Sequence, residues 1–504
     1  MTSLWLRLDG NGPRFRQLYR ALRAAIVDGT LAPGAKLPAT RALAGELGMS
    51  RTTVLLAFEH LAAEGYLAGR HGSGSYVQAV PAPTRKPASR RAAERAPQLS
   101  AWGTALTASR RRPLYSGYVS ERPHLPYDFR YGAPSMADFP LRAWQRCLGR
   151  RARRAAARAY DYGHRQGSPA LRAALAGYLR RSRGIACEPD ELLIVNGSQQ
   201  ALDLAARVLL DRGDRAVVEE PGFEGARHAL RAAGAELVLG AVDDEGFDPA
   251  VLAGAGRAAR LAYVTPSHQY PLGGVMPYRR RVALLDWAAR ADAWIVEDDY
   301  DSEFRFAGRP LEALKALDEQ RRVLYVATCS KVMFPALRIG YAVVPPALVE
   351  PLVRAKAIAD GGSPVLEQDA LADFIGSGDF ERHLRRSRTR IGARRAALLA
   401  ALAHELGDAV EVCGANAGMH LVAWLRDVPA AQVGALCRAA VEVGVGLYPV
   451  SPFYDAPPPR AGLLLGYAAL GERDIRIGVE RLARLVAQRG NKRVGRQRRT
   501  ALLR

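Results

Sequence analysis

The chain has 504 residues, of which 49% are hydrophobic and 24% are charged, so it is long enough to bury two or more cores. No apolar run approaches the roughly 20 residues that cross a bilayer, and the first residues lack a signal-peptide pattern, so we expect a cytoplasmic protein without membrane contact. A formal charge of +22 indicates attraction to a polyanion, but charge alone does not separate specific DNA binding from general stickiness.

The five cysteines argue against a disulfide framework and against a metal site. Their number is odd, they are widely scattered, and no two of them form a CxxC pair. We therefore expect no bound metal, and reduced, mostly buried thiols at Cys147, Cys187, Cys329, Cys413 and Cys437.

Residues 14–77 show the pattern of a small, mainly helical domain. Apolar residues recur at helical spacing from Leu18 to Ile26, and a turn rich in glycine and proline follows. A second helix is expected from about Thr40, as its N-cap, to Leu47.

A third helix and a hairpin complete this domain. Ser50 is the expected N-cap of a helix whose inner face runs from Val54 to Ala62, and Gly65 ends it. Residues 66–68 and 75–77 flank a Gly-rich turn and predict a short hairpin. Two helices joined by a tight turn and followed by a hairpin predict a winged helix-turn-helix, which lays its third helix in the major groove of double-stranded DNA.

Side chains at the start of the third helix can reach base edges, and those of the wing can reach the DNA backbone. The alternative is a small helical domain whose arginines are merely solvated. The expected DNA contacts are Arg41, Ser50, Arg51, Thr52 and Thr53 on the helices, and His71 and Gly72 in the wing.

The rest of the chain divides into three segments. Residues 78–126 lose all periodicity and are rich in Pro, Ala, Ser and Arg, so we expect a basic linker. Residues 127–490 alternate short β-branched runs with amphipathic stretches, which predicts an α/β domain with a mainly parallel sheet and helices on both faces. Residues 491–504 are expected to form a disordered basic tail.

One lysine stands where a strand of such a sheet ends. The chain has six lysines, and Lys331 alone follows an apolar strand, in VLYVATCSK, whereas Lys315 and Lys356 lie in segments that we expect to be exposed helices. Ligands of open α/β sheets bind at the carboxyl ends of the strands, where a desolvated lysine is a good nucleophile. We therefore predict that Lys331 forms a Schiff base with the aldehyde of pyridoxal phosphate.

Other residues are expected to bind the ring and the phosphate of pyridoxal phosphate. Asp298 ends the strand AWIVED and is placed to hold the protonated pyridine nitrogen, although Glu297, Asp299 and Asp301 remain alternatives. Tyr300 is expected near the ring hydroxyl, and Phe223 is either a stacking ring or a core aromatic. The expected phosphate ligands are Ser198 and Gln199 at a helix start, together with Thr328, Ser330 and Arg338.

Residues 14–77 resemble the GntR-type winged helix. The stretch that carries the resemblance is GTLAPGAKLPATRALAGELGMSRTTVLLAFEHLAAEGYLAGRHGSGSYV. The resemblance implies DNA contacts by Arg41, Arg51 and His71. Leu55 departs from the pattern, because many relatives have a base-reading arginine at this position.

The larger domain resembles the fold-type-I aminotransferase domain of MocR-type transcription regulators. The resemblance is carried by YGHRQGSPALRAALAGYL, IVNGSQQALDLAARVLLDRGD, TPSHQYPLGG, VEDDYDSEFRFAGRPLEAL and CSKVMFPALRIGY. It implies the same cofactor residues: Lys331 as Schiff-base lysine, Asp298, Tyr300, and Ser198, Thr328 and Arg338 toward the phosphate. Phe223 stands where a tyrosine is common. The resemblance also implies a head-to-tail homodimer.

Two departures weaken the prediction of an aminotransferase. Residues 268–271 read His-Gln-Tyr-Pro, where enzymes have an asparagine before the proline. The arginine that would hold a substrate carboxylate has only Arg460 as a candidate, with a plain loop arginine as the alternative.

We therefore expect a regulator that senses pyridoxal phosphate itself, or an amine or amino acid that reacts with the Lys331 aldimine. The alternative is a working aminotransferase with an appended DNA-binding module. A nonspecific basic nucleoid binder is a third possibility, but it would not require Lys331 and Asp298.

Overall fold

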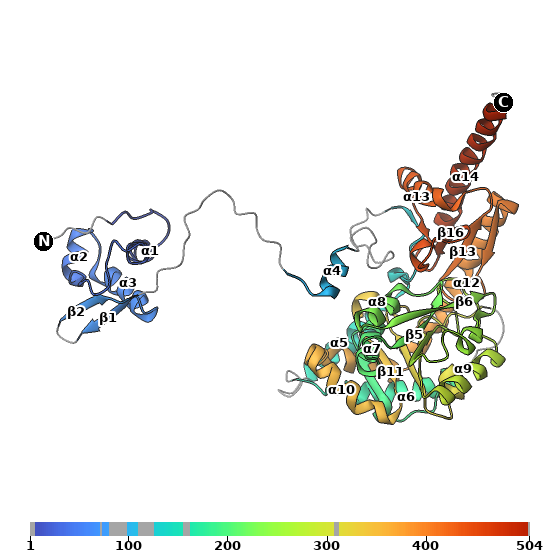
Figure 1. Ribbon diagram of the computed structural model, residues 1–504, viewed down its shortest axis with the longest axis horizontal. Coiled ribbons are helices and arrows are strands. Elements are labelled where there is room, and N and C mark those ends of the chain that lie inside the picture. The colour runs from blue at the N-terminus through green and yellow to red at the C-terminus, as the bar shows by residue number, and fades with distance from the viewer. Residues whose placement is uncertain are drawn as a thin grey trace. The chain divides into compact units, whose positions relative to one another are not determined.

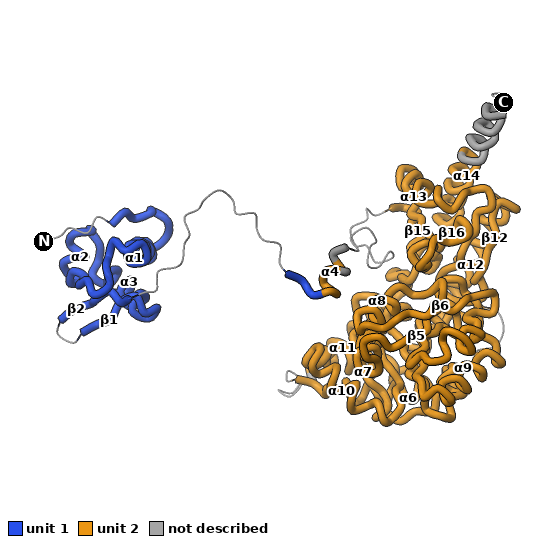
Figure 2. Tube along the Cα trace, in the orientation of Figure 1, with its two compact units in different colours: residues 1–100 blue, residues 101–504 orange. Residues whose placement is uncertain are grey.

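The computed structural model describes residues 6–70, 73–79, 98–108, 125–154, 162–306 and 312–501. The chain forms two compact units, residues 1–100 and 101–504 (Figure 2). Helix α4, Ala101–Ala108, lies inside the stretch 78–126, so the expectation of a linker without periodic structure is wrong for these residues. Within the described residues no helix has the length and apolar character needed to cross a membrane.

The first unit packs three helices against a hairpin (Figure 1). Leu18, Leu43, Val54 and Leu61 have no exposed surface, because the apolar stripes of all three helices meet in one core. The elements are α1 Arg14–Val27, α2 Thr40–Glu46, α3 Arg51–Ala63, and the antiparallel strands β1 Leu67–Arg70 and β2 Gly74–Val77.

The helix boundaries follow the expected caps with one exception. Ser50 is the N-cap of α3 and its hydroxyl accepts a hydrogen bond from the Thr53 backbone N–H at 3.1 Å. Thr40 was expected as the N-cap of α2 but is its first helical residue. The N-cap is Ala39, which has no side chain to accept a bond.

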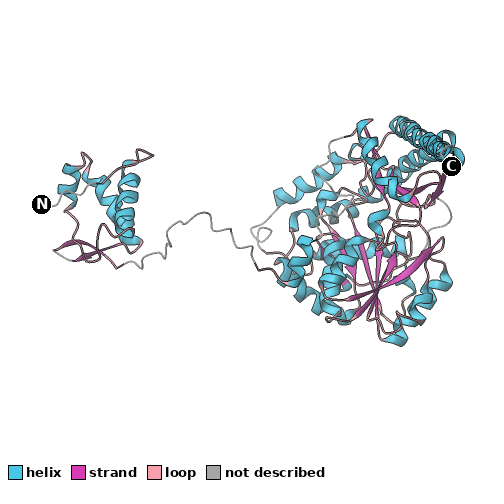
Figure 3. Ribbon diagram, turned by 45° about the horizontal axis from the view of Figure 1, so that its top comes forward, coloured by secondary structure: helices cyan, strands magenta, loops and turns pink. Residues whose placement is uncertain are grey.

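The second unit is built on an eight-stranded, mainly parallel sheet, as the sequence predicts (Figure 3). Strand β11 runs antiparallel to both of its neighbours, and the short β7 pairs antiparallel with β6 at the edge. In spatial order the strands are β4 Leu192–Val195, β11 Gly340–Val343, β10 Val323–Thr328, β9 Trp294–Asp299, β8 Leu261–Val264, β5 Arg215–Glu220, β6 Glu236–Asp243 and β7 Gly246–Phe247.

Helices cover both faces of this sheet, which is why its central strands are mostly apolar. Along β10, Leu324 and Val326 enter one core while Tyr325 and Ala327 enter another, as the two-residue period of a strand requires. The helices are α5 Leu141–Arg154, α6 Pro169–Arg183, α7 Ser198–Leu209, α8 Glu224–Ala232, α9 Tyr278–Ala291, α10 Pro346–Asp360 and α11 Val365–Gly376.

A smaller antiparallel sheet stands beside the long helices α12, Asp379–Leu406, and α14, Glu472–Ala501. Helix α14 continues through Ala501, so the expectation of a disordered tail from residue 491 is wrong for the described backbone. The other elements are β12 Val410–Cys413, β13 His420–Leu425, β15 Tyr448–Pro449, β16 Ala461–Gly466, helix α13 Val433–Glu442, and β3 Tyr127–Asp128 paired with β14 Val445–Gly446.

Candidate functional site

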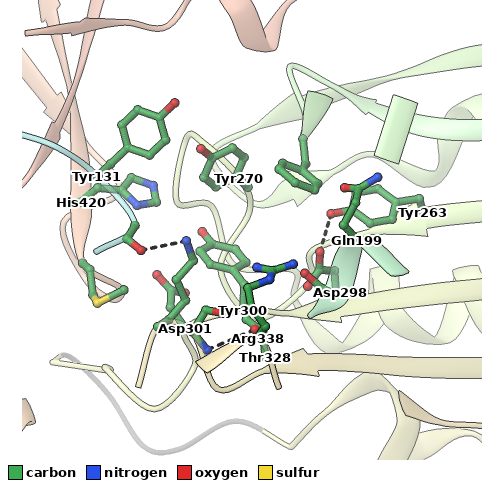
Figure 4. A pocket seen from close by; sticks show the side chains of 16 residues that line it. Tyr131, Gln199, Tyr263, Tyr270, Asp298, Tyr300, Asp301, Thr328, Arg338 and His420 are labelled. Atoms are coloured by element: carbon green, nitrogen blue, oxygen red, sulfur yellow. Dashed lines mark hydrogen bonds between the residues drawn. The ribbon is translucent and has the colours of Figure 1, made fainter. Parts of the chain in front are cut away.

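The side chains expected around the cofactor line one cavity of about 330 Å³ at the carboxyl ends of β8, β9 and β10 (Figure 4). Parallel strands that end side by side bring segments distant in the chain to one place. The predicted residues that line the cavity are Lys331, Asp298, Tyr300, Ser198, Gln199, Phe223, Thr328, Ser330 and Arg338.

Lys331 lies in the loop that follows β10, and its Nζ donates a hydrogen bond to the Gly132 carbonyl at 2.9 Å. A Cβ at position 132 would lie 2.6 Å from that Nζ, and the residue has φ +74°, so glycine is required for this approach. Of the lysines whose side chains the structure describes, Lys331 alone lines the cavity.

The expectation that the other central lysines are exposed is wrong. Lys356 has no exposed surface and forms an ion pair with Asp360, while Lys315 keeps 12% of its side chain exposed and pairs with Asp318. A lysine can be buried when a carboxylate about one turn away neutralises its charge. The sequence pattern around these lysines did not show that they are buried.

The structure distinguishes among the four neighbouring acids that competed to hold the pyridine nitrogen. Each acid other than Asp298 is held by a charged side chain, a histidine or backbone N–H groups. These partners are the backbone N–H groups of residues 314–315 for Glu297, Arg183 at 2.7 Å for Asp299, and His268 at 3.0 Å for Asp301.

Asp298 keeps one oxygen available to a ligand. Its Oδ2 accepts a hydrogen bond from the Tyr263 hydroxyl at 2.8 Å, whereas its buried Oδ1 has no hydrogen-bond partner among the described residues. Burial raises the pKa of Asp298 to about 7. A buried unpaired oxygen is costly, and the protonated nitrogen of a pyridine ring would satisfy it, so this residue fits pyridoxal phosphate.

The opposite end of the cavity fits a phosphate. Ser198 opens helix α7, whose free N–H groups favour an anion. Gly197 before it has φ +85°, and a Cβ there would lie 2.7 Å from the Arg338 guanidinium. Arg338 donates to the Asn196 carbonyl at 2.8 Å, and the buried Ser330 Oγ has no partner among the described residues. These groups form a cradle that a phosphate would complete.

Tyr300 is supported by a buried histidine. Its hydroxyl shares a hydrogen bond with His268 Nδ1 at 2.9 Å, and the Asp301 carboxylate lies 3.0 Å from the same nitrogen. Burial by itself would lower the pKa of His268, but Asp301 outweighs it and raises that pKa. His268 thus links the Tyr300 hydroxyl to the Asp301 carboxylate. It belongs to residues 268–271, the segment in which enzymes have an asparagine.

His420 lies in the interior and also on the cavity wall. Its Nε2 lies 3.2 Å from the Pro271 carbonyl. Burial and then His268 lower the pKa of His420 well below its usual value, which keeps the ring neutral.

Aromatic rings line the rest of the cavity. Phe223 precedes α8 and meets Tyr270 edge to face at 5.8 Å, and Tyr270 meets Tyr300 in the same way at 5.4 Å (Figure 4). Sequence reasoning missed Tyr131 and Tyr263. The one available signal for Tyr263 was a hydroxyl-bearing ring inside the otherwise apolar strand LAYV.

Arg460, the candidate for an effector carboxylate, does not line this cavity. Its guanidinium pairs with Glu411 at 2.6 Å and lies 5.2 Å above the ring of Trp424, with 42% of the side chain exposed. The alternative of a plain surface arginine describes its surroundings in the structure.

The raised pKa of Asp298 predicts a pH effect on the cofactor-free protein. The folded carboxyl binds its proton up to about pH 7, and the unfolded one only up to about pH 4, so its contribution to stability is lost as the pH rises through this window. Between pH 4 and 7 the unfolding free energy should therefore fall less in Asp298→Asn than in the unaltered protein, by about a few kcal/mol. Urea unfolding of both proteins at pH 4 and 7 measures it.

Other buried acids also make the unfolding free energy depend on pH, and the comparison of the two proteins accounts for them. Glu297 and Glu303 also have pKa values raised to about 7 by burial, and they are present in both proteins, so their contribution cancels in the comparison. An identical pH dependence with and without the Asp298 carboxyl would contradict the prediction.

In the first unit, the start of α3 is exposed as a DNA-reading surface requires. Arg51 and Thr52 are exposed, as is Arg41 at the start of α2. Thr53 is half-buried, and its hydroxyl is hydrogen-bonded to that of Ser50 at 2.8 Å, so these two side chains also hold the helix start together. Leu55 is 44% exposed on the same helix.

The wing carries two cations that sequence reasoning missed. The ring of Tyr76 on β2 lies beneath Arg70, at 4.9 Å, and Lys36, at 5.9 Å. Residues 35–37 pair with β2 and thereby bring Lys36 to the wing, which its distance along the chain concealed. The predicted contacts His71 and Gly72 lie outside the described residues.

Comparison with known proteins gives the same two parts. Residues 138–482 match the family model "Aminotransferase class I and II", and residues 15–77 match "Bacterial regulatory proteins, gntR family". The fold and its cavity define an aminotransferase-like, fold-type-I protein that uses pyridoxal phosphate as its cofactor.

Two similar relatives are named as regulators, and a solved structure shares the fold of the second unit. The chain is 42% identical to the probable rhizopine catabolism regulatory protein MocR of Rhizobium meliloti over 95% of both chains. It is 33% identical to the HTH-type transcriptional regulator TauR of Rhodobacter capsulatus over 96% of this chain and 98% of that one. LysN, an α-aminoadipate aminotransferase from Thermus thermophilus, superposes with TM-score 0.69 and 31% identity over 78% of this chain and 99% of its own.

The chain belongs to the MocR-type regulators, in which a GntR-type winged helix precedes an aminotransferase-like domain. It is a DNA-binding transcription regulator that depends on pyridoxal phosphate.

Proposed function

We propose that the second unit is a sensor and that occupation of its cavity changes the affinity of the first unit for operator DNA. The effector is pyridoxal phosphate itself, or an amine or amino acid that takes the place of Lys331 on the cofactor. The observation that carries the proposal is the unpaired Oδ1 of Asp298 in a cavity that also contains Lys331, on a chain with an exposed DNA-reading helix.

The residues of the chain have distinct tasks in this proposal. When bound, pyridoxal phosphate supplies an aldehyde that links covalently to a primary amine. Asp298 holds a proton at the ring nitrogen, Tyr300 orients the ring through its hydroxyl, and Arg338 with the start of α7 holds the phosphate. Lys331, which Gly132 positions, provides the amine that an effector would displace.

The regulator would work on DNA as a symmetric pair. Arg41, Ser50, Arg51, Thr52 and Thr53, with His71 and Gly72 of the wing, would contact one half-site, and a head-to-tail homodimer would match two half-sites. The DNA-binding module supports a place of action in the cytoplasm, where the operator lies. Signalling then requires that the effector bind two dimer arrangements with different affinities.

A DNA-binding titration tests the sensor. We expect the affinity of the cofactor-free protein for a promoter fragment beside its own gene to change about 5-fold or more when pyridoxal phosphate is added, or when candidate amines are added to the cofactor-bound protein. Equal affinity under all of these conditions in the unaltered protein would contradict a sensing function.

The second candidate is an active aminotransferase, favoured by the complete set of ring-holding residues and by the likeness to LysN. Multiple-turnover amino transfer with amino-acid and keto-acid pairs distinguishes the two. Among the described residues, Arg338 is the sole arginine on the cavity wall, and it faces the phosphate end, so we expect no sustained turnover.

A further inference from the structure

A fully buried lysine lies outside the cavity on helix α10. Lys356 has no exposed surface, and its Nζ lies 3.1 Å from a carboxylate oxygen of Asp360, one turn further along the helix. Burying an ammonium group is costly unless it is paired and hydrogen-bonded, so a charge at this depth calls for a specific reason. Holding the sheet core together does not supply one, because an apolar side chain would do that at lower cost.

Asp360 gathers further donors from both sides of the start of helix α7 and from the backbone after α10. Its carboxylate accepts hydrogen bonds from Gln200 Nε2 at 2.7 Å, Asn196 Nδ2 at 3.2 Å and the Gly362 backbone N–H at 2.9 Å. Burial by itself would raise the pKa of Asp360, but the hydrogen bonds from Gln200 and Lys356 outweigh it and lower that pKa. The carboxylate therefore stays charged and anchors both amides.

The two amides flank the segment that forms the phosphate cradle. Asn196 and Gln200 lie on either side of residues 197–199, and the Asn196 N–H donates to Gln200 Oε1 at 2.8 Å, which closes the segment into a loop. The Asn196 carbonyl also accepts the hydrogen bond from Arg338 Nη2 at 2.8 Å. Asn196 thus connects Asp360 through its side chain with Arg338 through its carbonyl.

The close packing around this loop leaves it little freedom. A Cβ on Gly340 of β11 would lie 2.9 Å from the Gly197 carbonyl carbon, so the strand and the loop touch through their backbones. A shift of the loop would move the N–H groups at the start of α7 and Arg338 together, and both are the groups that face the phosphate end of the cavity.

We propose that Lys356 and Asp360 are positioning residues for the phosphate cradle. They fasten the end of α10 to the start of α7, so that the N–H groups of α7 and the Arg338 guanidinium stand in place before the cofactor arrives. Preorganisation of this kind improves affinity because the ligand does not have to order the groups that bind it. The pair therefore acts on the phosphate monoester of the cofactor and leaves the ring and the aldehyde to other residues.

A comparison of pyridoxal phosphate with pyridoxal, which lacks the phosphate, isolates this role. The cofactor-free, full-length protein is titrated with each ligand, and the visible absorption of the lysine-bound ligand reports the affinity. We expect Asp360→Ala and Lys356→Met to weaken binding of pyridoxal phosphate about tenfold and to change binding of pyridoxal less than about twofold.

Helix α10 offers a matched control. Arg354 and Glu350 form an ion pair with the same spacing as Lys356 and Asp360, but both side chains are more than 70% exposed. Arg354→Met should leave the affinities for both ligands unchanged, because an exposed pair contributes little and touches nothing in the cradle.

Two further variants protect the test against a folding defect. Asp360→Asn keeps an oxygen that accepts the Gln200 hydrogen bond and should retain more affinity for pyridoxal phosphate than Asp360→Ala. Lys356→Met/Asp360→Asn buries no charge, and thermal unfolding shows whether it folds. An equal loss of affinity for pyridoxal phosphate and for pyridoxal in folded Asp360→Ala and Lys356→Met would overturn the proposal, because a merely structural pair does not distinguish a phosphate. No loss of affinity for either ligand in these two variants would overturn it as well.

Discussion

Replacing Lys331 by alanine is expected to abolish the visible absorption band of the lysine-bound cofactor while leaving the fold intact. The amine is the sole lysine nitrogen on the cavity wall among the side chains that the structure describes, and it has no neighbour that could take over the covalent link. Asp298, Tyr300 and the phosphate cradle remain, so the cofactor should still bind, but without a covalent bond. Absorbance spectra of the purified protein with added pyridoxal phosphate measure the effect.

Lys356→Met serves as the control for Lys331→Ala, since it also removes a central lysine. It should keep the visible band once pyridoxal phosphate is added at a concentration above its weakened affinity. Persistence of the band in Lys331→Ala would show that another lysine carries the cofactor and would contradict the assignment of the cavity. Near-ultraviolet circular dichroism shows whether the fold is retained.

Replacing Arg51 by alanine is expected to weaken operator binding by about 1–3 kcal/mol, which corresponds to a loss of roughly 5- to 150-fold. Arg51 is exposed in the first turn of α3, which Ser50 caps, so its guanidinium is directed away from the core of the first unit. From this position an arginine can reach the O6 and N7 atoms of a guanine in the major groove. Titration of an operator fragment at fixed salt measures the loss.

Arg16→Ala separates base reading from general charge in the Arg51 measurement. Arg16 is also exposed but lies on α1, so its removal lowers the net charge by the same amount without touching the third helix. We expect Arg51→Ala to reduce the preference for operator over unrelated DNA and Arg16→Ala to keep that preference. An equal, small loss of operator affinity in both variants would contradict the placement of α3 in the major groove.

The fold followed from the sequence where local pattern and packing agree. The strands that end at the cavity were predicted from short apolar runs, because a sheet covered on both faces needs apolar side chains along most of each strand. The cap of α3 was predicted as well, since a serine before a helix satisfies a free N–H by a contact three residues away.

Other predictions failed because the deciding contact is distant in the chain or leaves no periodic signal. Lys356 was expected on an exposed helix face, yet the Asp360 carboxylate neutralises it in the interior. Lys36 was assigned no part in the wing, because only strand pairing with β2 brings it there. Thr40 had the chemistry of an N-cap, but the helix begins at Thr40 itself.

The prediction for Lys331 came from the sequence alone, because Lys331 follows an apolar strand and lies in a segment that resembles the MocR-type regulators. The pattern of helices and strands predicted the two-part organisation, and the resemblance to the MocR-type regulators implied the cofactor. The choice of Asp298 over its three acidic neighbours needed the tertiary structure. All four residues look alike along the strand end, and what separates them is which partner each meets across the sheet: backbone N–H groups, Arg183, His268, or an open cavity. Those partners come from different strands and loops, and only folding brings them together.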